Sequence, residues 1–399
     1  MSRDGNRATG GNALSESSRA ERGIGSPESD LSASHSCAGR SLAPLGMTIW
    51  CVLLALLASP LEAQAPAPWQ GRGIVAAAAA AQPPAETAAA QAVAMVGLTV
   101  SDMPRSVEFY TTVLNFIQET DDELADAAVE ELQGVFGARI RVVRLRLGEE
   151  RLQLTQYLAP RGRPAPADAR SNDHWFQHVA IIVSDMDRAY ARLRQFGVQH
   201  SSTGPQTLPA TIPAAAGIRA FYFRDPDGHP LEILQFPPDK GDPRWRQESG
   251  RLFLGIDHTA IVVDDTEASL GFYRDALGFR VAGESLNFGT EQEHLNNVRG
   301  ARLRITGLRA AKGPGVEFLE YLAPTDGRPF PADEQANDLI HWQTTILVPD
   351  AAAAADAVRR GRFRLVSPGA VTLPDTSLGF RRGLRVRDPD GHVVQLVER

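Results

Sequence analysis

Asp225-Pro226-Asp227-Gly228-His229 returns further along the chain as Asp388-Pro389-Asp390-Gly391-His392. The five residues are a strong hairpin-turn signal, because proline fixes φ and glycine accepts positive φ. We interpret His229 and His392 as turn residues rather than ligands. Other pairs repeat at an offset that stays between 163 and 165 residues: Leu158-Ala159-Pro160 with Leu322-Ala323-Pro324, Asn172-Asp173 with Asn337-Asp338, and Thr207-Leu208-Pro209 with Thr372-Leu373-Pro374. Such a period indicates two tandem copies of one domain.

Each copy divides again into two segments that open in the same way, so the repeat region contains four modules. An apolar run ends in Val-x-Asp or a close variant, and a helical pattern follows. The aspartate suits the N-cap of that helix, because its carboxylate accepts the free N–H groups of the first turn. Each module closes with a short apolar strand. The openings and closings are 96–102 with 151–154, 179–185 with 230–234, 259–265 with 316–319, and 344–350 with 393–396.

Composition limits the class of protein. The chain has 399 residues, more than one compact core usually holds, a net charge of −7 and a pI near 5.8. Basic residues are not clustered, which argues against nucleic acid as a partner. Both cysteines, Cys37 and Cys51, precede the repeat, so the repeat has neither a disulfide framework nor thiol chemistry.

The N-terminal part has the pattern of an export signal. Ile49–Ala58 is an apolar run too short to span a bilayer, and Ala63-Gln64-Ala65 follows as a small-x-small cleavage site. We therefore expect export to the periplasm or the medium, with no membrane span after processing, or a cytoplasmic protein if the leader is not a signal. The expected organisation is a leader over 1–65, an Ala/Pro-rich linker over 66–92, a domain over 93–237, a linker over 238–253 and a second domain over 254–399.

These features resemble the vicinal oxygen chelate superfamily, which contains glyoxalase I, bleomycin-binding proteins and extradiol dioxygenases. The resemblance rests on the strand-Asp-helix openings with Phe109-Tyr110 and Phe272-Tyr273, the Asp-Pro-Asp-Gly hairpins and the apolar closing strands. It implies an α+β fold in which four βαβββ modules form two glyoxalase-like curved-sheet barrels. The fold alone is a weak guide to function, because many chemistries share it.

The resemblance also implies a metal site. Family ligands come from the first and last strand of a module. The matching positions are Met95 and Gln153 in module 1, His178 and Glu232 in module 2, His258 and Glu317 in module 3, and Gln343 and Gln395 in module 4. Only the two central modules keep a histidine and a glutamate. We therefore predict a divalent metal ion (Zn, Ni, Fe, Mn or Co) held by His178, Glu232, His258 and Glu317.

Two pairings of the modules are open. If each half closed on itself, each cavity would have one histidine and one glutamate. If module 2 pairs with module 3, and module 1 with module 4, one cavity has all four candidate ligands and the other has none. We favour the crossed pairing, in which modules 2 and 3 share one site.

The favoured function is a metal-dependent enzyme that acts on a small oxygen-bearing substrate. A metal with open positions chelates adjacent oxygens and stabilises an enolate, which suits glyoxalase-like lyase or isomerase chemistry. Glu232 and Glu317 are the candidate catalytic bases. One alternative is a non-catalytic binding protein of the bleomycin-resistance type, and a further one is a dioxygenase.

Several differences from the patterns of individual family members limit the possible functions. Gln343 and Gln395 occupy two positions of the dioxygenase ligand pattern, although His341 on the same strand face is a possible substitute. A glutathione-dependent reaction conflicts with export. The strand arginines at 139, 141, 144, 146, 302 and 304 are interpreted as a solvated face in preference to an anion site. The aromatic residues at 174–176 and 341–342 either line a cavity or pack a module junction.

Overall fold

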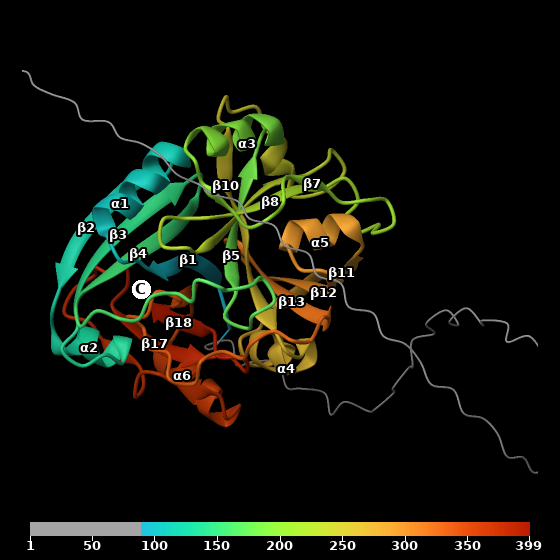
Figure 1. The fold of residues 1–399 in the computed structure, drawn as a ribbon. Coiled ribbons are helices and arrows are strands. Elements are labelled where there is room, and N and C mark those ends of the chain that lie inside the picture. Colours follow the sequence, from blue (N-terminus) through green and yellow to red (C-terminus); the bar gives the residue numbers. More distant parts are fainter. Residues whose placement is uncertain (1–88) are drawn as a thin grey trace, which may run out of the picture. The chain divides into compact units, whose positions relative to one another are not determined.

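A computed structural model describes residues 89–399, which lie in one compact unit. The predicted leader and most of the Ala/Pro-rich linker are outside the described residues. Among the described helices, none has the length and apolar character needed to cross a membrane. The fold is mixed α+β, with two curled nine-stranded sheets and few helices (Figure 1).

The four predicted modules are all present. Module 1 contains β1 (Ala92–Thr99), α1 (Met103–Glu108), η1 (Phe109–Val113), β2 (Ile117–Leu124), α2 (Ala127–Gln133), β3 (Arg139–Leu147) and β4 (Glu150–Ala159). Module 2 contains β5 (Gln177–Val183), α3 (Met186–Gln195), β6 (Gln199–His200), β7 (Gln206–Thr207), β8 (Arg219–Arg224) and β9 (Pro230–Gln235). A short 3₁₀ helix, η2 (Pro243–Arg246), lies in the connection between the two copies.

The second copy repeats this order. Module 3 contains β10 (Phe253–Val263), α4 (Thr266–Leu270), η3 (Gly271–Ala276), β11 (Arg280–Phe288), α5 (Thr290–Asn296), β12 (Arg302–Arg309) and β13 (Gly315–Ala323). Module 4 contains β14 (Trp342–Leu347), α6 (Ala351–Arg360), β15 (Arg364–Leu365), β16 (Val371–Thr372), β17 (Arg382–Arg387) and β18 (Val393–Glu398).

The strand order shows the crossed pairing of modules. In the sheet that we call the outer-module sheet, β14 of module 4 pairs antiparallel with β1 of module 1. In the central-module sheet, β5 of module 2 pairs antiparallel with β10 of module 3. The order β11-β12-β13-β10-β5-β9-β8-β6 therefore brings the two ligand-bearing modules into one sheet, and β5 and β10 run side by side in Figure 1.

The local signals in the sequence behave as predicted. Each aspartate after an opening strand caps its helix by accepting backbone N–H groups; the four are Asp102, Asp185, Asp265 and Asp350. At the repeated turn, Asp225 accepts from the backbone N–H of Asp227 and of His229. Gly228 and Gly391 have φ values of 93° and 107°, the region that favours glycine.

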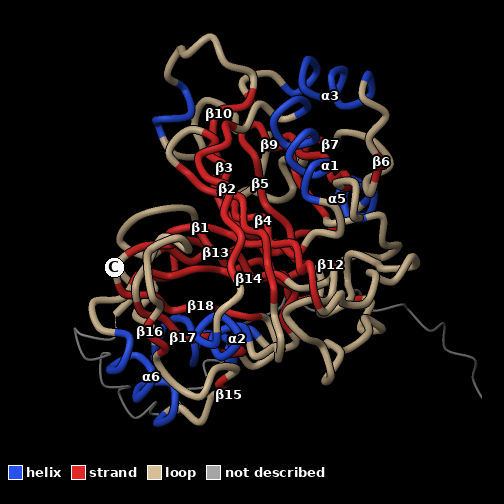
Figure 2. Tube along the Cα trace, turned by 90° about the vertical axis from the view of Figure 1, so that its left-hand side faces the viewer, coloured by secondary structure: helices blue, strands red, loops and turns tan. Residues whose placement is uncertain are grey.

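The two largest hydrophobic clusters lie between the sheets and the helices that follow the opening strands, and two smaller clusters, which include residues of α2 and α5, lie on the inner faces. One cluster joins modules 1 and 2 through residues such as Tyr110, Leu154, Ile181 and Phe221. A second cluster joins modules 3 and 4 in the corresponding way. Figure 2 shows the helices at the periphery of the strands.

Two loops interlock the copies with nearly the same contacts. Arg163 bonds Asp338 at 2.6 Å, and its counterpart Arg328 bonds Asp173 at 2.7 Å. Both aspartates are buried, so the ion pairs are protected from solvent screening on one side. These contacts hold the crossed modules in register.

Candidate metal centre

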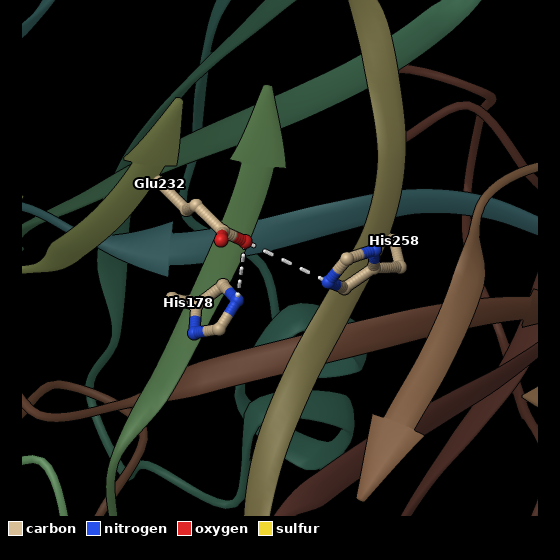
Figure 3. A group of neighbouring side chains, drawn as sticks. All are labelled: His178, Glu232 and His258. Carbon is tan, nitrogen blue, oxygen red and sulfur yellow. Dashed lines mark ion pairs between the residues drawn. The ribbon is translucent and has the colours of Figure 1, made fainter. Parts of the chain in front are cut away.

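Three of the four predicted ligands converge. His178 lies on β5, Glu232 on β9 and His258 on β10, and one ligand atom from each lies within 4.8 Å of the other two (Figure 3). Glu232 Oε2 is 3.1 Å from His178 Nε2 and 3.7 Å from His258 Nε2. The register of the sheet explains the convergence, because Ala180 is opposite both Glu232 on β9 and His258 on β10.

Glu317, the fourth predicted ligand, lies outside this group of three. It is on β13, and its Oε2 is 3.6 Å from His258 Nε2. Its side chain is 25% exposed, whereas that of Glu232 is 4% exposed. The two carboxylates therefore differ in access to the cavity, a difference that strand position alone did not predict.

The three residues fit a divalent cation. Neither ring nitrogen of His178, nor Nε2 of His258, makes a hydrogen bond among the described residues, although all are buried. Unpaired buried polar atoms are costly, so an ion in contact with them would stabilise the site. Ligand atoms about 2.1 Å from one ion lie roughly 3.0–3.4 Å apart, and the two distances from Glu232, 3.1 and 3.7 Å, are close to this range. Two imidazoles and a carboxylate are a donor set that suits Zn, Ni, Fe, Mn or Co.

A cavity of about 380 Å³ opens beside the cluster. Its wall includes Glu232, His258 and Glu317, together with the phenol of Tyr222. Burial raises the pKa of Glu317, and the charge of Glu232 adds to the rise while His258 opposes it. Burial by itself would lower the pKa of His258, but Glu317 and Asp257 together raise it to about 9.

The sequence did not reveal several residues at this site. Tyr222 stacks at an angle on His178, with ring centroids 4.8 Å apart. Asp257 contacts His258 Nδ1 at 3.0 Å, and Arg309 contacts Asp257 at 2.8 Å. An aspartate next to a histidine inside an apolar strand was the available signal for the second contact. Tyr222 had no signal beyond its place before the repeated turn.

Other candidates have structural contacts. His229 bonds the carboxylate of Asp225 and the carbonyl of Leu339, which confirms its role in the turn. His341 bonds Glu334, so it does not replace Gln343 as a ligand. Phe176 and Trp342 pack in hydrophobic clusters and also line a small crevice of about 30 Å³, separate from the 380 Å³ cavity. Four of the six strand arginines form ion pairs with acidic residues on neighbouring elements: Arg139 with Glu123, Arg141 with Asp121, Arg146 with Glu119, and Arg304 with Glu284.

The comparisons define the class of protein. The Glyoxalase/Bleomycin resistance protein/Dioxygenase superfamily model matches residues 92–233 and again 255–396. The chain belongs to this superfamily, with two repeats.

Individual relatives add detail. The 2-epi-5-epi-valiolone epimerase of Actinomyces sp is 35% identical over 170 residues, which are 41% of this chain and 88% of the relative. Glyoxalase I from Zea mays has a similar fold, with a TM-score of 0.50, 17% identity, and coverage of 77% of this chain and 92% of that one. A mutant of the same maize enzyme gives a TM-score of 0.51 at the same identity and coverage.

Proposed function

We propose that this protein is a metal-dependent isomerase that moves a proton at a carbon next to a carbonyl group. The convergence of His178, Glu232 and His258 beside a cavity is the observation that carries the proposal. The similarity to an epimerase supports an isomerase in preference to the lyase that glyoxalase chemistry suggests. Modules 2 and 3 would then share one active site.

A bound divalent cation would withdraw electron density from a carbonyl oxygen and make the adjacent C–H group more acidic. The protein residues have separate tasks. His178, Glu232 and His258 would hold the ion, since their free lone pairs face one another. Tyr222 packs against His178 and lines the cavity, so its ring would shield one side of the bound ion from water.

Glu317 is the proposed base. It lines the cavity, is more exposed than Glu232, and has a raised pKa, so it is suited to accept a proton from carbon and return it. Glu232 lies 3.1 Å from His178 and is nearly inaccessible, which favours a ligand role. The reaction is an internal proton transfer and needs no oxidant, reductant or second substrate.

The cavity wall favours a neutral, hydroxylated substrate. Among its charged groups carboxylates predominate, and the guanidinium of Arg309 is already bonded to Asp257. A chain of polar groups from Ser285 through Asn287 to Gln292 lines another part of the wall. Hydroxyl and amide groups of this kind bind substrate hydroxyls, whereas an anionic substrate would face several negative charges.

Proton exchange in deuterated water tests this role of Glu317. The metal-loaded protein would be incubated with 2-epi-5-epi-valiolone, and with other neutral hydroxyketones, while deuterium incorporation is followed by NMR. We expect exchange and isomerisation with the wild type. Glu317→Gln should lower both rates by about 100-fold or more and keep the metal, since general-base catalysis contributes about 10²–10⁴-fold.

Glu232→Gln is the matched control, because it should lose the metal together with activity. Equal metal loss in both variants would contradict the separate tasks of the two glutamates. A metal-loaded wild type that binds hydroxyketones but never exchanges a proton would overturn the isomerase and favour a binding protein.

A further inference from the structure

Strand β10 has a bulge next to His258. The pairing of β10 with β5 shifts register between Ile256 and His258, so that Asp257 is the extra residue. Consecutive side chains of a regular strand point to opposite faces, and a bulge changes that direction. Here the bulge brings the Asp257 carboxylate to its own neighbour, with Oδ2 3.0 Å from His258 Nδ1.

Asp257 accepts hydrogen bonds from two other residues, Arg309 and Trp245. Arg309 on β12 donates to the Asp257 carboxylate and to its backbone carbonyl, each at 2.8 Å. Trp245 of η2 donates its indole N–H to Oδ1 at 3.1 Å. Asp257 is only 4% exposed, so these bonds fix the carboxylate in a protected setting.

The connection between the two copies, which contains η2, packs closely against β10 and so places Trp245 beside Asp257. Trp245 passes close to Gly255, where an added Cβ would lie 2.9 Å from the indole ring and closer still to the Glu150 carboxylate. Arg244 stacks on Trp245 at 3.9 Å and bonds Glu150 at 2.7 Å. Glu150 also accepts from the backbone N–H of Ile256, so the connection is attached beside the bulge.

The repeat supplies an internal comparison. The outer-module sheet has the same bulge, with a register shift between Val93 and Met95. The residue at the Asp257 position there is Ala94, and the residue at the His258 position is Met95. Arg146, at the position of Arg309, pairs with Glu119 instead. The bulge in the central-module sheet therefore has a carboxylate followed by a histidine, whereas the bulge in the outer-module sheet has neither.

From these observations we infer that Asp257, held by Arg309 and Trp245, is a positioning residue that turns His258 Nε2 toward the metal. The inference rests on the proposed function for its metal. A carboxylate on Nδ1 fixes the ring and the tautomer, which leaves Nε2 as the lone-pair donor. The connection between the copies is in this way a structural part of the candidate metal centre.

Metal affinity of four variants tests the inference. The probe is Co²⁺, titrated into the metal-free full chain with a competing chelator and followed by its visible spectrum. Asp257→Ala should weaken binding by about 10–100-fold and change the spectrum. Asp257→Asn, which still accepts from Nδ1–H, should recover most of the affinity. Trp245→Phe, which removes the indole donor and part of the ring but leaves the bond from Arg309, should show a smaller loss.

Glu284→Ala is the control for general loss of negative charge, since Glu284 lines the same cavity without contacting His258. It should bind Co²⁺ within about twofold of the wild type, as expected of an exposed charge. Unchanged affinity of Asp257→Ala would overturn the inference and leave the proposed function standing. Equal losses in Asp257→Asn and Asp257→Ala would also overturn it, because a positioning bond survives in the amide.

A second measurement does not depend on metal. The ¹⁵N shifts of His258 in the metal-free protein, recorded with the imidazole neutral, report the tautomer. We expect the Nδ1–H form in the wild type and in Asp257→Asn, and a mixture in Asp257→Ala. The same mixture in all three proteins would overturn the positioning role. A wild type that shows the Nδ1–H form but binds no metal would overturn the proposed function and, with it, the metal-directed part of this inference.

Discussion

The two sheets of this protein have the same strand order, but their inner faces differ. One lies beside an open cavity, and the other is filled by side chains. In the central-module sheet, Tyr222 is opposite Glu232, and a cavity of about 380 Å³ lies beside them. In the outer-module sheet, Arg385 occupies the place of Tyr222, opposite Gln395. The crevice around Arg385 has a free volume of about 0 Å³.

The contacts of Arg385 explain the difference. Its side chain is fully buried, and its Nε donates to Gln395 Oε1 at 3.0 Å. Glutamines at the ligand positions bind divalent metals poorly but accept hydrogen bonds from a guanidinium. The fold therefore has two equivalent inner faces. A few side chains on each face determine whether it forms a binding cavity or part of the core.

The largest effect should come from removing a histidine. We expect the wild type to bind about one equivalent of metal, because only one inner face has the donor set. His178→Ala and His258→Ala should each lose it, with binding at least about 100-fold weaker. Elemental mass spectrometry on the purified chain measures both.

Gln343→Ala is the matched control, because Gln343 is the counterpart of His178 in the outer-module sheet. It should keep the full metal content. A second equivalent in the wild type that this variant removes would break the comparison between the two sheets.

Removal of Arg385 should destabilise the fold without affecting the metal. Arg385→Ala leaves a cavity and an unpaired Gln395, at a cost of about 3 kcal/mol in the free energy of unfolding. Urea denaturation gives this value, and a Co²⁺ titration gives the affinity. Arg382→Ala on the same strand is the control: its side chain is 39% exposed, so the change should be below about 1 kcal/mol. If Arg385→Ala bound metal more weakly than Arg382→Ala, the two inner faces would not be independent.

A smaller, pH-dependent effect should separate the two repeated turns. Burial would raise the pKa of Asp225, but the His229 imidazole at 2.8 Å offsets this and holds the pKa below its usual value. Burial and the charge of Asp390 raise the pKa of Asp388 to about 6, with only partial opposition from His392. Ionised Asp225 therefore contributes stability that is lost as the pH falls through its folded pKa. Protonated Asp388 contributes stability at low pH that is lost as the pH rises through 6.

Unfolding of Asp225→Asn and Asp388→Asn at pH 4, 5.5 and 7 measures this contrast. Relative to the wild type, Asp388→Asn should gain up to about 2 kcal/mol between pH 4 and pH 7. Asp225→Asn should be less stable than the wild type by nearly the same amount at all three pH values, because the lowered pKa of Asp225 places its titration below this range. Parallel pH profiles of the two variants would show that the turns are electrostatically alike.

Much of this architecture could be predicted from local patterns. The 163-to-165-residue offset, the N-cap aspartates and the Asp-Pro-Asp-Gly turns each act over a few residues, so they are legible without any tertiary contact. The positions of the four candidate ligands came from the family resemblance that these local patterns support. The export signal concerns residues outside the described part of the chain and stays a prediction.

Long-range pairing settled the rest. Both pairings of the modules were compatible with the sequence. The hydrogen bonds between β5 and β10 show that the crossed pairing is the one formed. The separation of Glu317 from the cluster, the burial of Arg385 and the turn of Asp257 toward His258 depend on register, a bulge and packing between distant segments. Such features arise from backbone pairing across the sheet, and the periodicity of a single strand contains no information about its partner.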